Sequence, residues 1–252
     1  MAQVLNINRM IWFAKRMIIM NGKSLIIGFG ALAGFLLFIL SMNLISEPYI
    51  SSNAILGTTM PFVYLAGFIV TSLVFREMHT PGKAYHYLTL PVSNLERLIT
   101  SWLVTAVFYL LAALIALYVI NGLLFAVSTF VPGANVQFVD LFSKDLYQAL
   151  AVYLVIQPVF LVGAAYFRKN TFLKTLLALF VISLIIAAYA VLNAYLIFGP
   201  EPQMSFSHNN INIRMEELFT SHVPEMAKIF FWYVQLPLLL IISYFRLKET
   251  QI

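Results

Sequence analysis

Long apolar runs, separated by short charged segments, set the pattern of this chain. Six runs contain no charged residue, and they cover 25–46, 48–75, 98–139, 146–167, 175–200 and 229–245. A membrane-spanning helix needs about 20 apolar residues, and a charge at its centre costs about 2.5–3.5 kcal/mol. The runs do not alternate polar and apolar residues as a membrane-spanning β-strand does. The pattern predicts an all-α integral membrane domain over 1–252, with six transmembrane helices at about 25–46, 54–75, 98–124, 146–167, 175–198 and 229–245.

The third run is too long for one span and contains Asn121-Gly122, a dipeptide typical of turns. A hairpin at this point would give seven spans. Six spans with the N-terminus inside place 12 of the 15 Lys and Arg residues on the cytoplasmic side, whereas seven spans place 10 there. The positive-inside rule therefore favours six spans with both termini in the cytoplasm. We expect 125–145 to form an excursion at the outer surface, with its turn at Pro132-Gly133.

Composition fits this class and limits the partners. The chain is 62% hydrophobic and 10% charged, whereas a soluble domain carries about 25% charged residues. Its net charge of +5 predicts contact with anionic lipid headgroups rather than with nucleic acid. The sequence contains no cysteine, which excludes disulfides and thiolate nucleophiles. We expect a multi-pass protein of the inner, or plasma, membrane.

The segment 5–21 has the periodicity of an amphipathic helix. Its apolar positions are Ile7, Met10, Ile11, Ala14, Met17 and Ile18. Its polar positions are Asn8, Arg9, Lys15 and Arg16. This pattern predicts a helix that lies in the membrane interface and ends at Asn21-Gly22. The alternative is a basic flank that only orients the first span.

The apolar runs contain none of the histidine, aspartate or glutamate side chains that are typical of catalysis and metal binding. Gly-Lys-Ser at 22–24 lacks the glycine that a phosphate-binding loop needs five residues before Gly22, where Met17 stands. All four histidines lie outside the runs, and no Asp or Glu lies within one. This distribution disfavours a haem anchor, an intramembrane metalloprotease and an ion-coupled carrier. We expect no catalytic residue, cofactor or metal site in this chain.

Neutral amides are prominent among the polar side chains inside the predicted spans, and four of them are candidates for a substrate path: Asn121, Gln157, Asn193 and Gln235. They can hydrogen-bond between helices, which is the common use of such residues in membranes. They can also line a path for an amphipathic or lipid-like substrate. The sequence leaves both interpretations open.

The segment 79–91, HTPGKAYHYLTLP, predicts a short helix between the second and third spans. Thr80 is placed to cap it, with Pro81 at its first position, and the helix runs through Lys83 to Leu88. Pro91 prevents it from continuing. On the six-span topology this helix lies in the cytoplasm.

Ser93 and Glu96 follow as a capping box that begins the third span. Together with Glu77 before the short helix and Leu90-Pro91 after it, this block resembles the membrane subunits of type 2 ABC exporters. The predicted topology is also similar, with its surface helix before six spans. The block departs from the family in two places. It has no acidic residue over 84–87, and it has Ser101-Trp102 where a Gly-Lys pair is common.

The resemblance implies that 79–90 is a coupling helix, which docks on a separate ABC ATPase subunit that binds and hydrolyses ATP. Two copies of this chain, or one copy and a homologue, would form the substrate path as a dimer in a bacterial membrane. We expect Tyr85, Tyr87 and Leu88 to be exposed anchors for the ATPase. The alternative for the two tyrosines is that they lie flat among the lipid headgroups as an aromatic belt. The residues expected at the coupling site are Glu77, Lys83, Tyr85, His86, Tyr87, Leu88, Leu90 and Pro91. The alternative is a stand-alone secondary carrier or a structural bundle, which needs no ATPase partner.

Overall fold

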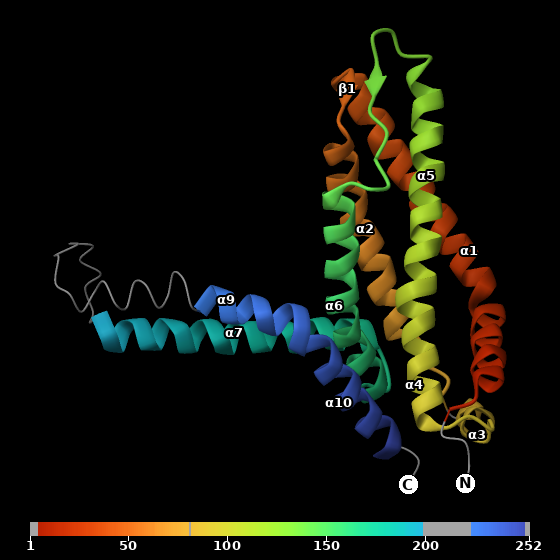
Figure 1. The fold of residues 1–252 in the computed structure, drawn as a ribbon, viewed down its shortest axis with the longest axis vertical. Helices are drawn as coiled ribbons and strands as arrows, with labels where there is room; N and C mark the ends of the chain where they lie inside the picture. Colours follow the sequence, from red (N-terminus) through yellow and green to blue (C-terminus); the bar gives the residue numbers. More distant parts are fainter. Residues whose placement is uncertain (1–4, 81, 199–222, 250–252) are drawn as a thin grey trace.

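A computed structural model describes residues 5–80, 82–198 and 223–249, which are nearly all helical (Figure 1). The first half of the chain contains α1 (Ile7–Ser46), β1 (Tyr49–Ile50), α2 (Ser52–Ser72), α3 (Lys83–Leu88), α4 (Asn94–Leu103), the π-helix η1 (Val104–Phe108) and α5 (Tyr109–Ser128). The second half contains β2 (Asn135–Val136), α6 (Lys144–Tyr166), α7 (Thr171–Phe198), α9 (Val223–Ile229), the π-helix η3 (Phe230–Val234) and α10 (Gln235–Glu249).

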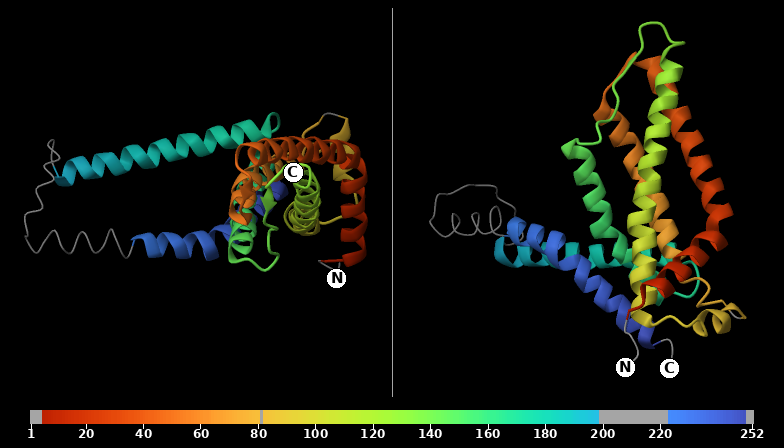
Figure 2. Two further views of the ribbon diagram at one scale, coloured as in Figure 1. Left: turned by 90° about the horizontal axis from the view of Figure 1, so that it is seen from above. Right: turned by 45° about the vertical axis from the view of Figure 1, so that its right-hand side comes forward.

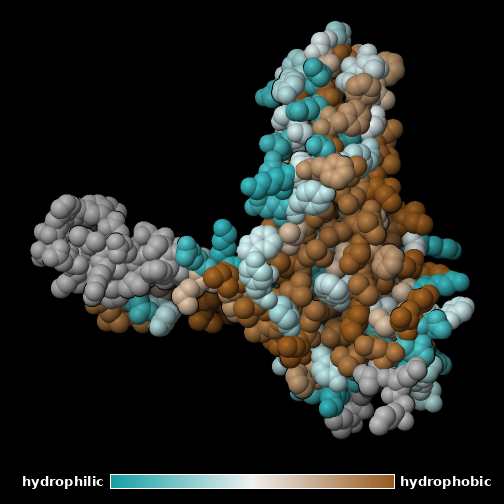
Figure 3. Space-filling model, in the orientation of Figure 1, coloured by the Kyte–Doolittle hydropathy of each residue, from teal (hydrophilic) through white to brown (hydrophobic). Residues whose placement is uncertain are grey.

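Six of the described helical segments are long and apolar enough to cross a membrane, so the predicted number of spans is confirmed. They are Leu25–Ser46, Ser52–Ser72, Asn94–Ser128, Lys144–Tyr166, Thr171–Asn193 and Phe230–Glu249. Hydrophobic residues cover most of the middle and lower part of the face shown in Figure 3, and hydrophilic residues gather nearer the two ends. The chain is a multi-pass helical membrane protein by these criteria.

The third span is one unbroken helical segment, so the seven-span alternative is wrong. Asn121 does not form a turn because its Nδ2 donates to the Leu117 carbonyl (2.8 Å), which satisfies the amide nitrogen within the helix. The helix continues to Ser128, beyond the predicted end at 124. The excursion that follows turns at Gly133, whose φ of 76° suits a residue without a Cβ. It then pairs β2 in parallel with β1.

The first helix is also unbroken, which corrects the predicted end at Asn21-Gly22. Figure 2 shows its N-terminal part turning sharply away from the direction of the rest. Ile7, Ile11 and Ile18 of the predicted apolar face are exposed, whereas Phe13 is buried against the protein. Whether the exposed face lies in a membrane interface stays a prediction.

Three buried clusters follow the long axis of the bundle. The far end, where β1 and β2 lie, is filled by aliphatic side chains from α1, α2, α5 and α6. The middle contains Tyr109 and Tyr153. The base, where α3 lies and where the described chain begins and ends, contains Phe13, Phe75 and Tyr87 (Figure 1). These clusters connect the base to the middle of the bundle.

The spans differ in how far they are enclosed. Half of the most hydrophobic stretch of α6 is buried, compared with 6% of that of α7. Thr171, at the start of α7, donates its hydroxyl to the Ser72 carbonyl (2.6 Å) and so fixes this end to α2. From there α7 runs across the direction of the other spans and projects away from the bundle (Figure 1). The central element of the described chain is therefore α6, and α7 presents an apolar surface.

Candidate functional site

The short helix α3 lies at the base, between the second and third spans, and its extent of Lys83–Leu88 confirms the predicted helix. Its start differs from the prediction. Gly82, with a φ of 83°, occupies the N-cap position and no side chain caps the helix. The Thr80 hydroxyl instead donates to the Arg76 carbonyl (2.8 Å), because Thr80 still belongs to the turns that end α2.

Tyr85 and Tyr87 point in opposite directions, so the expected exposure of Tyr87 is wrong. Tyr85 is 73% exposed, whereas Tyr87 is only 2% exposed. Each residue turns an α-helix by about 100°, so two residues reverse the face. The Tyr87 ring packs edge-on against Phe13 of α1, with ring centroids 6.0 Å apart. Burial raises the pKa of the Tyr87 phenol well above its usual value, so the side chain is neutral.

Arg97 fixes α3 to the start of the third span. Its guanidinium lies over the Tyr87 ring, 4.6 Å from the centroid, and its Nη2 donates to the Tyr87 carbonyl (3.2 Å). Arg97 is only 1% exposed. A buried guanidinium therefore binds the ring and the carbonyl of one tyrosine, and α3 cannot leave α4 without exposing both.

The N-terminal part of α1 joins the same site through two ion pairs. Arg16 contacts the Glu77 carboxylate at 2.7 Å, beyond the end of α2. Arg9 contacts the Glu96 carboxylate at 3.0 Å, in the first turn of α4. The two arginines lie seven residues apart, or about two helical turns, so they share one face of α1. The predicted basic face thus lies partly against the protein.

Glu96 has more partners than the predicted capping box provides. The capping box is confirmed, because the Ser93 hydroxyl accepts from the Glu96 N–H (3.2 Å) and the Ser93 N–H donates to the Glu96 carboxylate (2.8 Å). The other carboxylate oxygen accepts from the backbone N–H of Asn6 (2.7 Å). With Arg9 added, this fully buried carboxylate also joins the start of α1 to the start of α4.

We call the contacts Arg9–Glu96, Arg16–Glu77 and Arg97–Tyr87 the base clasp. Leu90 packs against the buried cluster beneath it. The carbonyl of Pro91 accepts from Arg9 Nη1 (3.4 Å). Of the residues predicted to couple, Glu77, Tyr87 and Leu90 contact the protein's own helices, and Pro91, which is exposed, does so through its carbonyl alone. Their expected role toward a partner is untested, but their contacts within the chain are defined.

The outer face of α3 consists of Lys83, Tyr85 and His86, which are all exposed. The rings of Tyr85 and His86 are in edge contact, with centroids 5.9 Å apart. The side chain of Leu88 lies outside the described part of the structure. This face therefore combines one projecting aromatic ring with a lysine and a histidine, and α3 contains no acidic residue.

His79 connects the end of α2 to the end of α6. Its Nε2–H donates to the Ala164 carbonyl (3.1 Å). Burial lowers the pKa of this imidazole, the hydrogen bond to Ala164 opposes that effect, and Arg168 and Arg246 nearby lower the pKa further. The neutral ring is therefore favoured in the fold. In the described ranges, no three His, Asp or Glu side chains gather closely enough to hold a metal ion.

The four amides predicted inside the spans do not gather at one place. Asn121 and Asn193 each donate to a carbonyl of their own helix. Gln157 of α6 donates to Thr105 Oγ1 (2.7 Å). Gln235 of α10 donates to the carbonyl of Val155 in α6 (3.4 Å). Two of the four therefore connect helices around α6, and they support the interpretation as interhelical hydrogen bonds.

Sequence reasoning missed the partners of the base clasp, although a signal was present. Glu77 and Glu96 are the two acidic residues between positions 48 and 139. Arg9 and Arg16 are separated by two helical turns, and their spacing could have been matched to these two acids. The role of Arg97 had no such signal, because it depends on which face α3 turns inward.

The fold and the site define a class of protein. The chain is a multi-pass α-helical membrane protein in which a short helix between two spans is fixed to the N-terminal helix at the base. No family model, curated protein or solved structure matches this chain.

Proposed function

We propose that this chain is the permease subunit of an ATP-driven exporter of the type 2 ABC class, and that it docks on its ATPase through α3. On this proposal the base faces the cytoplasm of a bacterial cell, and the spans of two subunits form the substrate path. The chain itself performs no catalysis. ATP is bound and hydrolysed by the partner subunits.

The observation that carries the proposal is the base clasp around α3. A six-residue helix is too short to hold its position by itself. Here it is attached to α1 through the packing of Tyr87 on Phe13, and to α4 through Arg97. A stand-alone bundle has no need to fix a short surface helix to two spans. A helix that transmits a push from a partner does need such attachment.

The mechanism follows from these contacts. Movement of the ATPases would displace α3, and the base clasp would carry that displacement to the N-terminal part of α1 and to the first turn of α4. The bundle would then shift between two arrangements according to how tightly each one binds the closed ATPase dimer. No covalent step in this chain is required.

The outer face of α3 indicates the chemistry of the docking groove. Tyr85 is an exposed ring of the kind that anchors protein interfaces. Lys83 and His86 beside it suit a groove with acidic residues at its rim. The family commonly has an acidic residue in this helix, whereas α3 has none. We therefore expect the charge pattern of this protein's ATPase groove to differ from that of the family.

The experiment is a purification of the tagged chain from its native membranes in a mild detergent. We expect an ATPase with a phosphate-binding loop to co-purify and to be identified by mass spectrometry. Tyr85→Asp should insert normally but lose most of that ATPase, because it places a charge at the anchor. Tyr147→Asp, which changes an exposed tyrosine of α6 away from the base, is the matched control.

Two results would count against the proposal. Preparations that are reproducibly free of any ATPase would favour a stand-alone carrier or structural protein. An unchanged amount of ATPase on Tyr85→Asp would remove the docking role of α3. Tyr87 is a poor target for this purpose, because a charge at a buried ring would disrupt the base itself.

The dimer and the substrate path are parts of the same proposal. The exposed apolar surface of α7 is the surface that a second copy of the chain, or lipid, would cover. Gln235, which is half-buried beside α6, is the amide proposed to line this path, since Gln157 is fully enclosed within the protein. A substrate with apolar and neutral polar parts suits this lining.

A further inference from the structure

The third span contains a π-helix in its first half. It occupies Val104–Phe108, between α4 and α5. A π-helix closes its hydrogen bonds over five residues instead of four, so it holds one residue more than an α-helical turn. Each residue of an α-helix contributes about 100° of rotation and 1.5 Å of rise. If this segment became α-helical, α5 would therefore rotate relative to α4 by about 100°, which is the rotation of one residue.

The hydrogen bonds around Thr105 show how the π-helix is held. The Tyr109 N–H donates to the carbonyls of Val104 and Ala106. In an α-helix it would donate to the Thr105 carbonyl instead. The Thr105 carbonyl accepts from the Tyr153 hydroxyl of α6 (2.8 Å). A side chain from another span thus occupies the carbonyl at the point where the α-helical register is interrupted.

A second side chain of α6 contacts the same threonine. Gln157 donates from Nε2 to Thr105 Oγ1 (2.7 Å) and to Thr71 Oγ1 of α2 (3.3 Å). Tyr153 and Gln157 lie four residues apart, so they share one face of α6. The Gln157 Oε1 is buried and has no partner among the described residues. The Gln157 amide therefore has hydrogen-bond partners for its nitrogen but none for its oxygen among the described residues.

Aromatic rings pack against the Tyr153 ring and position its hydroxyl. It stacks on Phe68, with centroids 5.6 Å apart and planes 5° apart, and on Tyr109, with centroids 5.5 Å apart. A Cβ added at Gly67 would collide with the Tyr153 hydroxyl oxygen. Gly67 thus leaves the space in which the hydroxyl reaches the third span.

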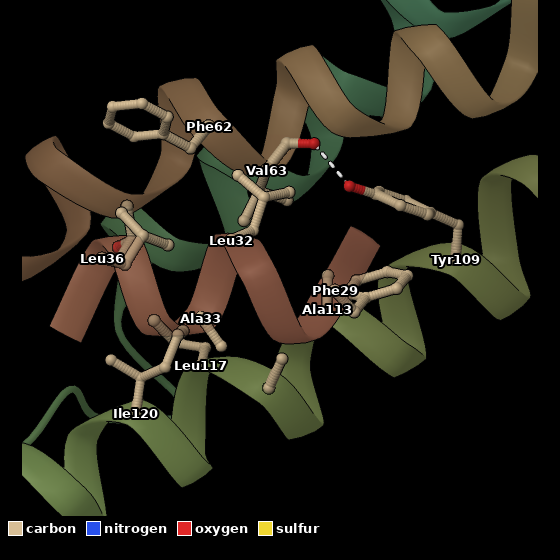
Figure 4. Close-up of a pocket in the computed structure, with 12 residues that line it drawn as sticks. Phe29, Leu32, Ala33, Leu36, Phe62, Val63, Tyr109, Ala113, Leu117 and Ile120 are labelled. Carbon is tan, nitrogen blue, oxygen red and sulfur yellow. Dashed lines mark hydrogen bonds between the residues drawn. The ribbon is translucent and has the colours of Figure 1, made fainter. Parts of the chain in front are cut away.

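The side of α5 that faces α1 is loosely packed next to the π-helix. Figure 4 shows an apolar pocket there, with Phe29 of α1 beside Ala113 of α5 and Ala33 of α1 beside Leu117 of α5. Tyr109 lies at one end of this pocket, and its hydroxyl donates to the Val63 carbonyl (2.6 Å). The pocket is lined almost entirely by apolar side chains, so no polar contact between described residues ties this part of α5 to α1.

We infer that η1 is a register switch, and that Tyr153 and Gln157 are the positioning residues that hold it in the π form. Loss of their hydrogen bonds to Thr105 lets η1 become α-helical and turns α5 relative to α4. The first turn of α4 carries Glu96 and Arg97 of the base clasp. The switch therefore converts movement of α3 into rotation of α5. This use in coupling rests on the proposed function, but the switch itself does not.

The first test is deletion of one residue. Deletion of Val107, an exposed residue of η1, removes the extra residue and leaves α4 and α5 in their present orientations. We expect the thermal unfolding temperature in detergent to stay within a few degrees of that of the parent chain. Deletion of Leu111, an exposed residue of α5, is the matched control and should lower it strongly because it shifts the register of a normal helix. Equal losses for the two deletions would overturn the inference.

The second test follows the rotation directly. Ala113→Cys introduces the single thiol of this cysteine-free chain at a buried position of α5. Tyr153→Phe keeps the stacked ring and removes one hydrogen bond, so labelling by a lipid-soluble maleimide should rise roughly fivefold. Deletion of Val107 should abolish that rise, which a merely structural role of Tyr153 would not explain. Unchanged labelling on Tyr153→Phe would overturn the inference, and it would do so whether or not an ATPase co-purifies.

Discussion

Glu96 and Arg97 occupy neighbouring positions and bind different helices. The Glu96 carboxylate receives N–H groups from Asn6 and Ser93 and the guanidinium of Arg9. Arg97 points to Tyr87 of α3. Charged groups are costly to bury unless they are paired or hydrogen-bonded, so their contacts must form together. Two adjacent residues thus determine how three segments meet at the base.

Gly67 offers the clearest prediction for a single residue. Gly67→Ala should destabilise the protein by about 1–3 kcal/mol, because a new Cβ would collide with the rings of Tyr153 and Tyr109. Gly57→Ala in the same helix is the control, since nothing lies within 4 Å of its added Cβ. It should be neutral or stabilising by up to about 1 kcal/mol. Thermal unfolding in detergent measures both, and an equal response would contradict the packing around Tyr153.

Features of single residues can be predicted from the sequence where the groups that cause them are close together in the chain. The capping box of Ser93 and Glu96 involves groups three residues apart, and it forms as predicted. The burial of Tyr87 was missed because it depends on Phe13, more than seventy positions earlier in the chain. Which tyrosine of α3 faces inward is decided by that distant contact and not by the sequence of α3.

At the scale of elements, the pairing of α1 with the segment around α3 can be tested by exchange of charges. Arg16→Glu places two carboxylates together and should increase hydrogen exchange in residues 7–20, because the N-terminal part of α1 loosens. The combination of Arg16→Glu with Glu77→Arg should restore protection. The pair is partly exposed, so we expect an effect of about 0.2–1 kcal/mol.

The control for this exchange is Lys15→Glu, at an exposed position beside Arg16. It carries the same change of charge and should leave protection of residues 7–20 unaltered. If the double variant were no better protected than Arg16→Glu alone, Arg16 and Glu77 would not interact in solution. Comparison of the single and double variants isolates this pair from general effects of charge.

The spans could be predicted from sequence because a charge in the membrane is costly wherever it lies. The six runs without a charged residue therefore correspond to the six candidate membrane-spanning helices. The unbroken course of α1 through Asn21-Gly22 was missed, because a turn signal is weak beside the continuing hydrogen bonds of a long helix. The π-helix was missed as well. Its hydrogen bonds to Tyr153 and Gln157 come from residues about fifty positions later in the chain.

At the scale of the whole molecule, the base clasp and η1 lie on one continuous line of contacts. The clasp connects α3 to α1 and α4, α4 continues into η1, and α6 holds η1 through two side chains. The apolar surface of α7 projects from this unit (Figure 1). On the proposed function, a push on α3 would reach the middle of the bundle through elements that are in direct contact with one another.

On the proposed function, the outer face of α3 contacts an ATPase. A photoreactive amino acid at position 85, in cells of the native host, tests it most directly, and the same residue at position 87 is the matched control. We predict that irradiation at position 85 yields an adduct with an ABC ATPase, identified by mass spectrometry, and that position 87 yields only adducts within the chain, near Phe13. Adducts of position 85 with lipid alone, or with no ATPase, would contradict the account.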